Sequence, residues 1–124
     1  MGPLPLSPLR TVAFTALFDR KAAALLTPEQ IAALTNAVAV APESGDLIPE
    51  SGGLRKVRVA ARGQGKRGGA RAIYYAGLEG GPIYMITIYG KDEKANLTKE
   101  DLRIFRRVID AIRAEHVRSK GKGL

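Results

Sequence analysis

The 124-residue sequence contains no cysteine, no tryptophan and a single histidine, His116. Without cysteine there is no disulfide framework and no thiolate chemistry, and a zinc site loses its main ligand. The lone histidine has no second imidazole with which to form a metal centre. No apolar run approaches the roughly 20 residues of a membrane-spanning helix, and the N-terminus is too proline-rich for the core of a signal peptide. We therefore expect a cytoplasmic protein that uses no metal, no cofactor and no membrane.

Positive charge is what the sequence has in excess. Lys and Arg number 20 against 12 Asp and Glu, which gives a formal net charge of +8. Seven of these cations, and no acid, lie between Ser51 and Leu78. Such a segment favours a polyanionic partner, with nucleic acid ahead of an anionic membrane surface or an acidic protein. Charge alone does not choose among these three.

The N-terminal half predicts one strand and two helices within a single domain. Residues 1–10 hold three prolines and should be irregular, and 11–15 alternate with the period of a strand. Helical spacing begins at Leu17. Thr27 then offers an N-cap, followed by proline at the first helical position, so a second helix should begin at Pro28 and end near Val40.

The C-terminal half predicts a sheet and a closing helix. Three runs bounded by glycine should be antiparallel strands, namely 54–61, 71–76 and 83–89. A long basic loop joins the first two, and a turn at 80–82 joins the last two. Thr98 begins a capping sequence for a final helix, and 119–124 should be a frayed basic tail. The expected class is α/β (α+β), with the domain spanning 11–118.

The strand from Leu54 carries the first candidate site. Alternation places Lys56 and Arg58 on one face, about 7 Å apart, and Val57 and Val59 on the other. Two cations at that spacing suit a phosphate backbone, although exposed strands of any basic protein can carry such a pair. Periodicity does not say which face Arg71 of the next strand addresses.

The basic loop contains a pattern that points away from nucleotide cofactors. Gly63-Gln64-Gly65-Lys66-Arg67-Gly68 fits G-x-G-x-x-G literally. That fingerprint requires a following helix whose N-terminus receives a pyrophosphate, whereas a strand follows here. We interpret the loop as a basic arm whose Lys66 and Arg67 close over a polyanion. A merely solvated hairpin loop is the alternative.

Four connected pieces carry a family resemblance. They read PESGDLIP at 42–49, GGLRKVR at 52–58, GKRGGARAIYY at 65–75 and YGKDEKANLT at 89–98. Their order, spacing and glycine placement resemble those of RelE/HigB-type toxins of bacterial type II toxin-antitoxin systems, over about residues 11–113. The resemblance implies a small RelE-like fold, in which two helices pack on a twisted, mostly antiparallel sheet whose concave face is basic.

The resemblance also implies an activity and a set of site residues. Family members cleave mRNA, many of them only in the ribosomal A site, by attack of a 2′-hydroxyl on the neighbouring phosphorus without a metal. Three residues match strand positions at which members keep catalytic basic residues: Lys56, Arg58 and Arg71. Lys91 and Lys94 follow the last strand, where further basic or aromatic residues contribute.

Roles and partners follow from the same resemblance. Arg71 is our candidate for stabilising transition-state charge and Lys56 is the candidate base. Asp92, where some members keep an arginine, puts the catalytic rate in question. We expect mRNA, the ribosome and a cognate antitoxin with an acidic segment as partners. The residues expected to bind RNA are Arg55, Arg62, Lys66, Arg67, Tyr75 and Tyr89.

Three alternatives stay open at this stage. The two tyrosines could stack on unpaired bases or simply pack in the core. A ParE-like toxin of the same fold would bind DNA gyrase and cleave nothing, and a third possibility is a non-catalytic nucleic-acid-binding relative. The basic strand pair and Arg71 favour the endoribonuclease. Asp92 and the lack of a good general base keep the non-catalytic relative open.

Overall fold

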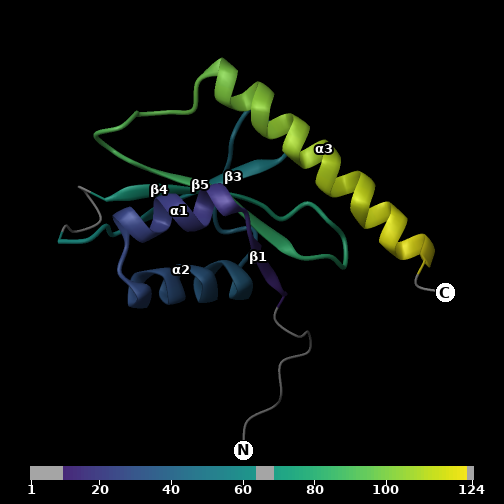
Figure 1. Cartoon of the computed structure of the whole chain (residues 1–124), viewed down its shortest axis with the longest axis horizontal. Helices are drawn as coiled ribbons and strands as arrows, with labels where there is room; N and C mark the ends of the chain where they lie inside the picture. Colours follow the sequence, from purple (N-terminus) through teal and green to yellow (C-terminus); the bar gives the residue numbers. More distant parts are fainter. Residues whose placement is uncertain (1–9, 64–68, 123–124) are drawn as a thin grey trace, which may run out of the picture.

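Three helices and five strands follow one another along the chain in the computed structural model, which describes residues 10–63 and 69–122 (Figure 1). In chain order they are β1 (Val12–Phe14), α1 (Ala16–Leu25), α2 (Pro28–Val40), β2 (Asp46–Leu47), β3 (Leu54–Val59), β4 (Ala70–Tyr75), β5 (Ile83–Gly90) and α3 (Lys99–Lys122). Within the described ranges, no helix is long and apolar enough to cross a membrane.

The strands form one mixed sheet in the order β1-β5-β4-β3-β2. β1 runs parallel to β5, and every other neighbouring pair is antiparallel. The predicted α+β class is therefore confirmed, with two N-terminal helices, a mostly antiparallel sheet and a C-terminal helix. The three predicted glycine-bounded strands correspond to β3, β4 and β5.

Both N-terminal helices start where side-chain oxygens can cap them. The Thr15 hydroxyl accepts a hydrogen bond from the Phe18 amide at 3.0 Å at the start of α1. At the start of α2, Thr27 and Gln30 form a reciprocal capping box, so the predicted start at Pro28 is confirmed. Capping of this kind satisfies amides that have no partner within the helix.

The sheet carries an apolar cluster on each face. On one face α1 and α2 cover the strands, and the buried residues there are Phe18, Ala22, Leu26, Leu34, Val38, Ala61, Ala70, Ala72, Tyr74, Ile83, Met85 and Ile88. On the other face α3 supplies Phe105 and Ile109, which pack with Leu54, Ile73, Tyr75, Leu78, Ile86 and Tyr89. Figure 1 shows α3 running obliquely past one end of the sheet, so the helix covers that face only in part.

A β-bulge interrupts the pairing of β4 with β5. Ile73 pairs with Thr87 and Tyr74 pairs with Met85, so Ile86 has no partner in the register. An extra residue of this kind reverses the alternation of the strand beyond it. Before the bulge the even-numbered Ile86 belongs to the α3 cluster, and after it the odd-numbered Tyr89 does.

The connection between α2 and β3 was predicted to be turns only, which is wrong for Asp46–Leu47. These two residues form β2 and pair with Lys56 and Arg55 of β3. A two-residue strand is too short for alternation to reveal it. The connection is also held from β4, because the Tyr74 hydroxyl donates to the Pro42 carbonyl at 2.8 Å and accepts from the Gly45 amide at 2.9 Å.

The predicted frayed tail at 119–124 is wrong as far as Lys122, where α3 ends. Lys and Arg are good helix formers, and adding residues to an existing helix costs little compared with starting one. The tail's composition predicted charge correctly but not backbone conformation.

Candidate functional site

Strand pairing brings two of the predicted cations and a tyrosine into one row. Arg58 of β3 lies opposite Arg71 of β4, and Arg71 lies opposite Tyr89 of β5. Directly opposed residues of antiparallel strands have Cα atoms about 5 Å apart. Lys56 belongs to the next row on the same face, opposite Ile73. We call Lys56, Arg58, Arg71 and Tyr89 the cationic row.

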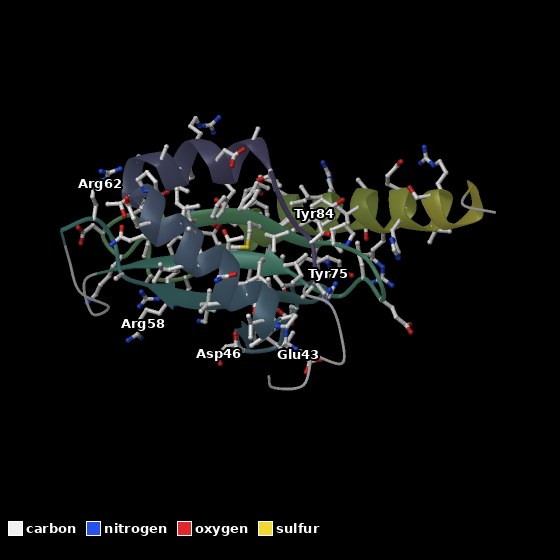
Figure 2. All side chains as sticks on the ribbon, turned by 90° about the horizontal axis from the view of Figure 1, so that it is seen from below. Glu43, Asp46, Arg58, Arg62, Tyr75 and Tyr84 are labelled. Carbon is white, nitrogen blue, oxygen red and sulfur yellow. The ribbon has the colours of Figure 1, made fainter. Side chains whose placement is uncertain are left out.

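The cationic row lies on the α3 face of the sheet, beyond the part that α3 covers. Leu54 and Tyr75 mark the covered part, because both pack with Phe105 and Ile109. Figure 2 shows Arg58 toward the opposite end of the sheet from Tyr75 and Tyr84. Arg58 is exposed accordingly.

The structure resolves which face Arg71 addresses. Ile73 and Tyr75, two and four residues further along β4, are both buried in the α3 cluster, so Arg71 shares their face. Its Nη1 atom is buried and has no hydrogen-bond partner in the described part of the chain. A buried donor without a partner costs about 1–3 kcal/mol, and more when it is charged. This nitrogen therefore favours an anion.

Tyr89 is the least accessible member of the cationic row, with 2% of its surface exposed. Burial raises the pKa of the Tyr89 phenol above 10.0, and the positive charges of Arg71 and Lys94 oppose that rise, while Asp101 adds to it. The phenol is thus protonated at neutral pH and can donate a hydrogen bond or a proton. Tyr75 is equally buried. Both rings pack in the core, and stacking of either on a base would require the α3 cluster to open.

An ion pair borders the cationic row on the side of α3. Lys94 Nζ lies 2.9 Å from Asp101 Oδ2, and the two side chains are 29% and 20% exposed. Thr98 accepts a hydrogen bond from the Asp101 amide through its hydroxyl, which confirms the predicted capping sequence. Burial acts to raise the pKa of Asp101, but hydrogen bonds from the Thr98 amide and from Lys94 hold the pKa below 3.8.

Two other predicted residues meet at the end of the sheet. Arg62 and Lys91 line one hollow of about 250 Å³, together with Asp92, Glu93 and glycines at the ends of the loop and of β5. The Arg62 guanidinium also donates to the Leu26 carbonyl at 2.8 Å, beyond the end of α1. Lys91 is exposed. The hollow adjoins the cationic row, since Gly90 directly follows Tyr89.

Arg55 lies apart from the other predicted cations. It alternates with Lys56, and its guanidinium donates to the carbonyls of Glu43 at 3.1 Å and Gly45 at 2.7 Å. Arg55 thus ties the α2–β3 connection to the sheet. Lys66 and Arg67 lie outside the described residues.

Asp101 is the site residue that sequence reasoning missed. The sequence indicated only its capping role. The available signal was the spacing of Asp101 to Lys94, seven residues earlier across a short loop, which sequence alone does not distinguish from ordinary charge balance. Among the described residues, no group of three or more His, Asp or Glu side chains is placed to hold a metal ion.

The raised pKa of Tyr89 predicts a change in stability at alkaline pH. The phenol of the unfolded chain ionises near pH 10, whereas the folded phenol stays protonated to higher pH, so unfolding becomes easier as pH rises past 10. We expect the difference in unfolding free energy between wild type and Tyr89→Phe to be constant below about pH 9 and to fall above about pH 10. Urea denaturation at a series of pH values measures it, and an increase above pH 10 would contradict the burial argument.

The fold and the site together define a small basic α+β protein whose mostly antiparallel sheet leaves a row of cations beyond its C-terminal helix. A family model described as the RelE toxin of the RelE/RelB toxin-antitoxin system matches residues 12–119. The chain therefore belongs to the RelE toxin family. It is a toxin of a type II toxin-antitoxin system, and membership implies a cognate antitoxin as its partner.

Proposed function

We propose that this toxin is an endoribonuclease that cleaves mRNA in the ribosomal A site and so inhibits translation, using Lys and Arg side chains of the sheet. The observation that carries the proposal is the buried Nη1 atom of Arg71, which has no hydrogen-bond partner in the described part of the chain. A phosphate oxygen would satisfy this nitrogen, and guanidinium groups bind phosphate through paired hydrogen bonds.

The cationic row contains groups suited to each step of the reaction. The 2′-oxygen forms a bond to phosphorus as its proton passes to a base, for which Lys56 is the candidate. Arg71 and Arg58, opposite one another, stabilise the negative charge of the phosphorane. The bond from phosphorus to the 5′-oxygen then breaks, and the leaving oxygen takes a proton, for which protonated Tyr89 is the donor nearest Arg71 in the row. The products are a 2′,3′-cyclic phosphate and a 5′-hydroxyl.

Dependence on the ribosome follows from what the cationic row does not supply. Its side chains offer charge and hydrogen-bond donors, and a lysine is a modest base at neutral pH. In-line attack also requires the 2′-oxygen, phosphorus and 5′-oxygen to be aligned, and alignment by a surrounding structure can contribute a large part of the rate. A ribosome that holds the codon in a fixed conformation would provide this alignment.

Primer extension on cellular mRNA after induced expression tests the proposal. We expect cuts in a fixed codon frame within translated regions, and none when Arg71→Ala is expressed at the same level. Intact transcripts with altered plasmid supercoiling would instead indicate a gyrase-directed toxin. Equal cleavage of protein-free RNA would overturn the requirement for the ribosome.

The charge of the toxin also supports a proposal about its antitoxin. Seven cations without an acid between Ser51 and Leu78 favour an acidic antitoxin segment over this surface. Exposed charges are screened within about 10 Å at 0.1 M salt. We expect the dissociation constant of the toxin-antitoxin pair to rise about tenfold or more between about 0.05 and 0.5 M NaCl. Calorimetry at several salt concentrations measures this, and a constant affinity would count against an acidic segment.

A further inference from the structure

We propose that Asp101 is a positioning residue that holds Lys94 at the edge of the cationic row before RNA binds. The inference rests on the proposed function, in which Lys94 helps to bind the phosphodiester. Nothing in the family match assigns a role to Asp101, and its place in the first turn of α3 accounts only for capping.

The geometry gives one carboxylate oxygen two tasks. Asp101 Oδ2 accepts a hydrogen bond from the Lys94 ammonium at 2.9 Å and another from the Thr98 amide at 2.9 Å. The second bond caps α3, and the first closes the loop between β5 and α3 onto the helix. Lys94 is therefore tied to the rigid start of α3 rather than to a mobile surface group.

This pair differs from the ion pair beside it. Glu100 and Arg103 also pair in the first turn of α3, at 2.7 Å, but each of those side chains is 64% exposed. Lys94 and Asp101 are 29% and 20% exposed. Exposed pairs contribute little because water and salt screen them, whereas screening is weaker for a partly buried pair. The Lys94–Asp101 pair is accordingly the one able to hold a side chain in place.

Holding Lys94 prepares it for a phosphate in two ways. A free lysine side chain loses considerable rotational freedom when it is immobilised, and the ion pair imposes part of that loss before RNA binds. The ammonium has three N–H donors, of which Asp101 uses one. The other two are available to phosphate oxygens.

The position of Lys94 relative to the cationic row is evident in Tyr89. The charges of Arg71, Lys94 and Asp101 all act on the pKa of the Tyr89 phenol, so the four groups form one electrostatic cluster. Asp101 in turn is fixed because Phe105, one turn further along α3, is buried against the sheet. The packing of α3 is thus connected to the position of Lys94 through a single carboxylate.

Asp101→Asn is the first test. Asparagine has nearly the same shape, and its side-chain oxygen can still accept the Thr98 amide, so α3 remains capped while the charge that holds Lys94 is lost. We expect kcat/KM for cleavage of ribosome-bound mRNA to fall about tenfold with little change in Tm. Glu100→Gln is the matched control: it removes the neighbouring carboxylate and should leave cleavage unchanged. Cleavage by Asp101→Asn at the wild-type rate would overturn the inference.

A double-mutant cycle shows whether Asp101 acts through Lys94. If it does, Lys94→Ala and the double variant Lys94→Ala/Asp101→Asn should cleave at the same rate. Losses that multiply would mean that Asp101 acts otherwise, and the inference would fail. A measurement independent of activity is NMR of the lysine ammonium groups. We expect a slowly exchanging Lys94 signal in wild type that is lost in Asp101→Asn, and its absence from wild type would also overturn the inference.

Arg71→Ala in the same assay separates this inference from the proposed function. If Arg71→Ala cleaves like wild type, the proposed site is wrong whatever Asp101 does. If Arg71→Ala is inactive and Asp101→Asn is fully active, only the role of Asp101 is wrong.

Discussion

Replacement of Arg71 by alanine is expected to slow cleavage of ribosome-bound mRNA by about 10²–10³-fold, the usual cost of removing one donor that stabilises transition-state charge. The same variant should be at least as stable as wild type. Arg71 has a buried nitrogen without a partner in the described part of the chain, and removing such a group relieves its desolvation cost. A loss of activity together with unchanged or increased stability is the signature of a residue whose partner is the substrate.

Arg71→Lys separates charge from shape. Lysine keeps the positive charge but lacks the planar fork that binds two phosphate oxygens, so we expect it to recover only a small part of the lost rate. Single-turnover cleavage and urea denaturation of the same preparations measure both effects. Full recovery by lysine would mean that charge alone suffices.

Arg55→Ala is the matched control on the same sheet. It also removes one guanidinium, but Arg55 alternates with Lys56 and binds the carbonyls of Glu43 and Gly45. We expect a loss of about 1–2 kcal/mol in unfolding free energy and unchanged cleavage per folded molecule. If Arg55→Ala and Arg71→Ala reduced cleavage equally, net charge rather than the cationic row would determine activity.

Gly69→Ala is expected to lower the unfolding free energy by about 3 kcal/mol or more, the upper range for overpacking. A Cβ atom at Gly69 would lie 2.0 Å from the Val59 carbonyl oxygen and 3.0 Å from its carbonyl carbon. These are backbone atoms at the end of β3, so no side-chain rotation relieves the contact. The strand ends must separate, and the shift would reach Lys91, whose amide donates to the Gly69 carbonyl at 3.3 Å.

Gly90→Ala supplies the comparison at the same end of the sheet. A Cβ atom there would meet only Leu25 Cδ2 at 3.5 Å, an ordinary contact. We expect a change of less than about 1 kcal/mol, measured by urea denaturation with both variants in one series. Equal destabilisation by the two substitutions would show that the close contact at Gly69 relaxes without cost.

Much of the fold was predictable because local signals agreed with it. The N-cap at Thr27 and the glycine-bounded strands each have a local physical cause that needs no distant partner. β2 and the end of α3 were not predicted, since a two-residue strand depends on its partner and a charged segment can continue a helix already formed. Tertiary pairing decided both.

The candidate site was predictable in composition but not in arrangement. Alternation correctly placed Lys56 and Arg58 together, but the sides taken by Arg71 and Tyr89 depend on cross-strand register, which sequence periodicity does not contain. Arg55 was grouped with its neighbours by charge although it alternates away from them. Asp101 was missed because its contact with Lys94 forms only after α3 has packed on the sheet.

The bulge at Ile86 has a consequence for comparing relatives. Deleting that one residue would restore regular alternation in β5, so every later side chain of the strand would change sides, with Ile88 turned toward the cations and Tyr89 toward α1 and α2. Homologues with and without the insertion would therefore carry an equivalent aromatic at positions that a gap-free alignment does not match. Gain or loss of activity in this lineage could thus arise from an indel in an apolar stretch, with every charged residue retained.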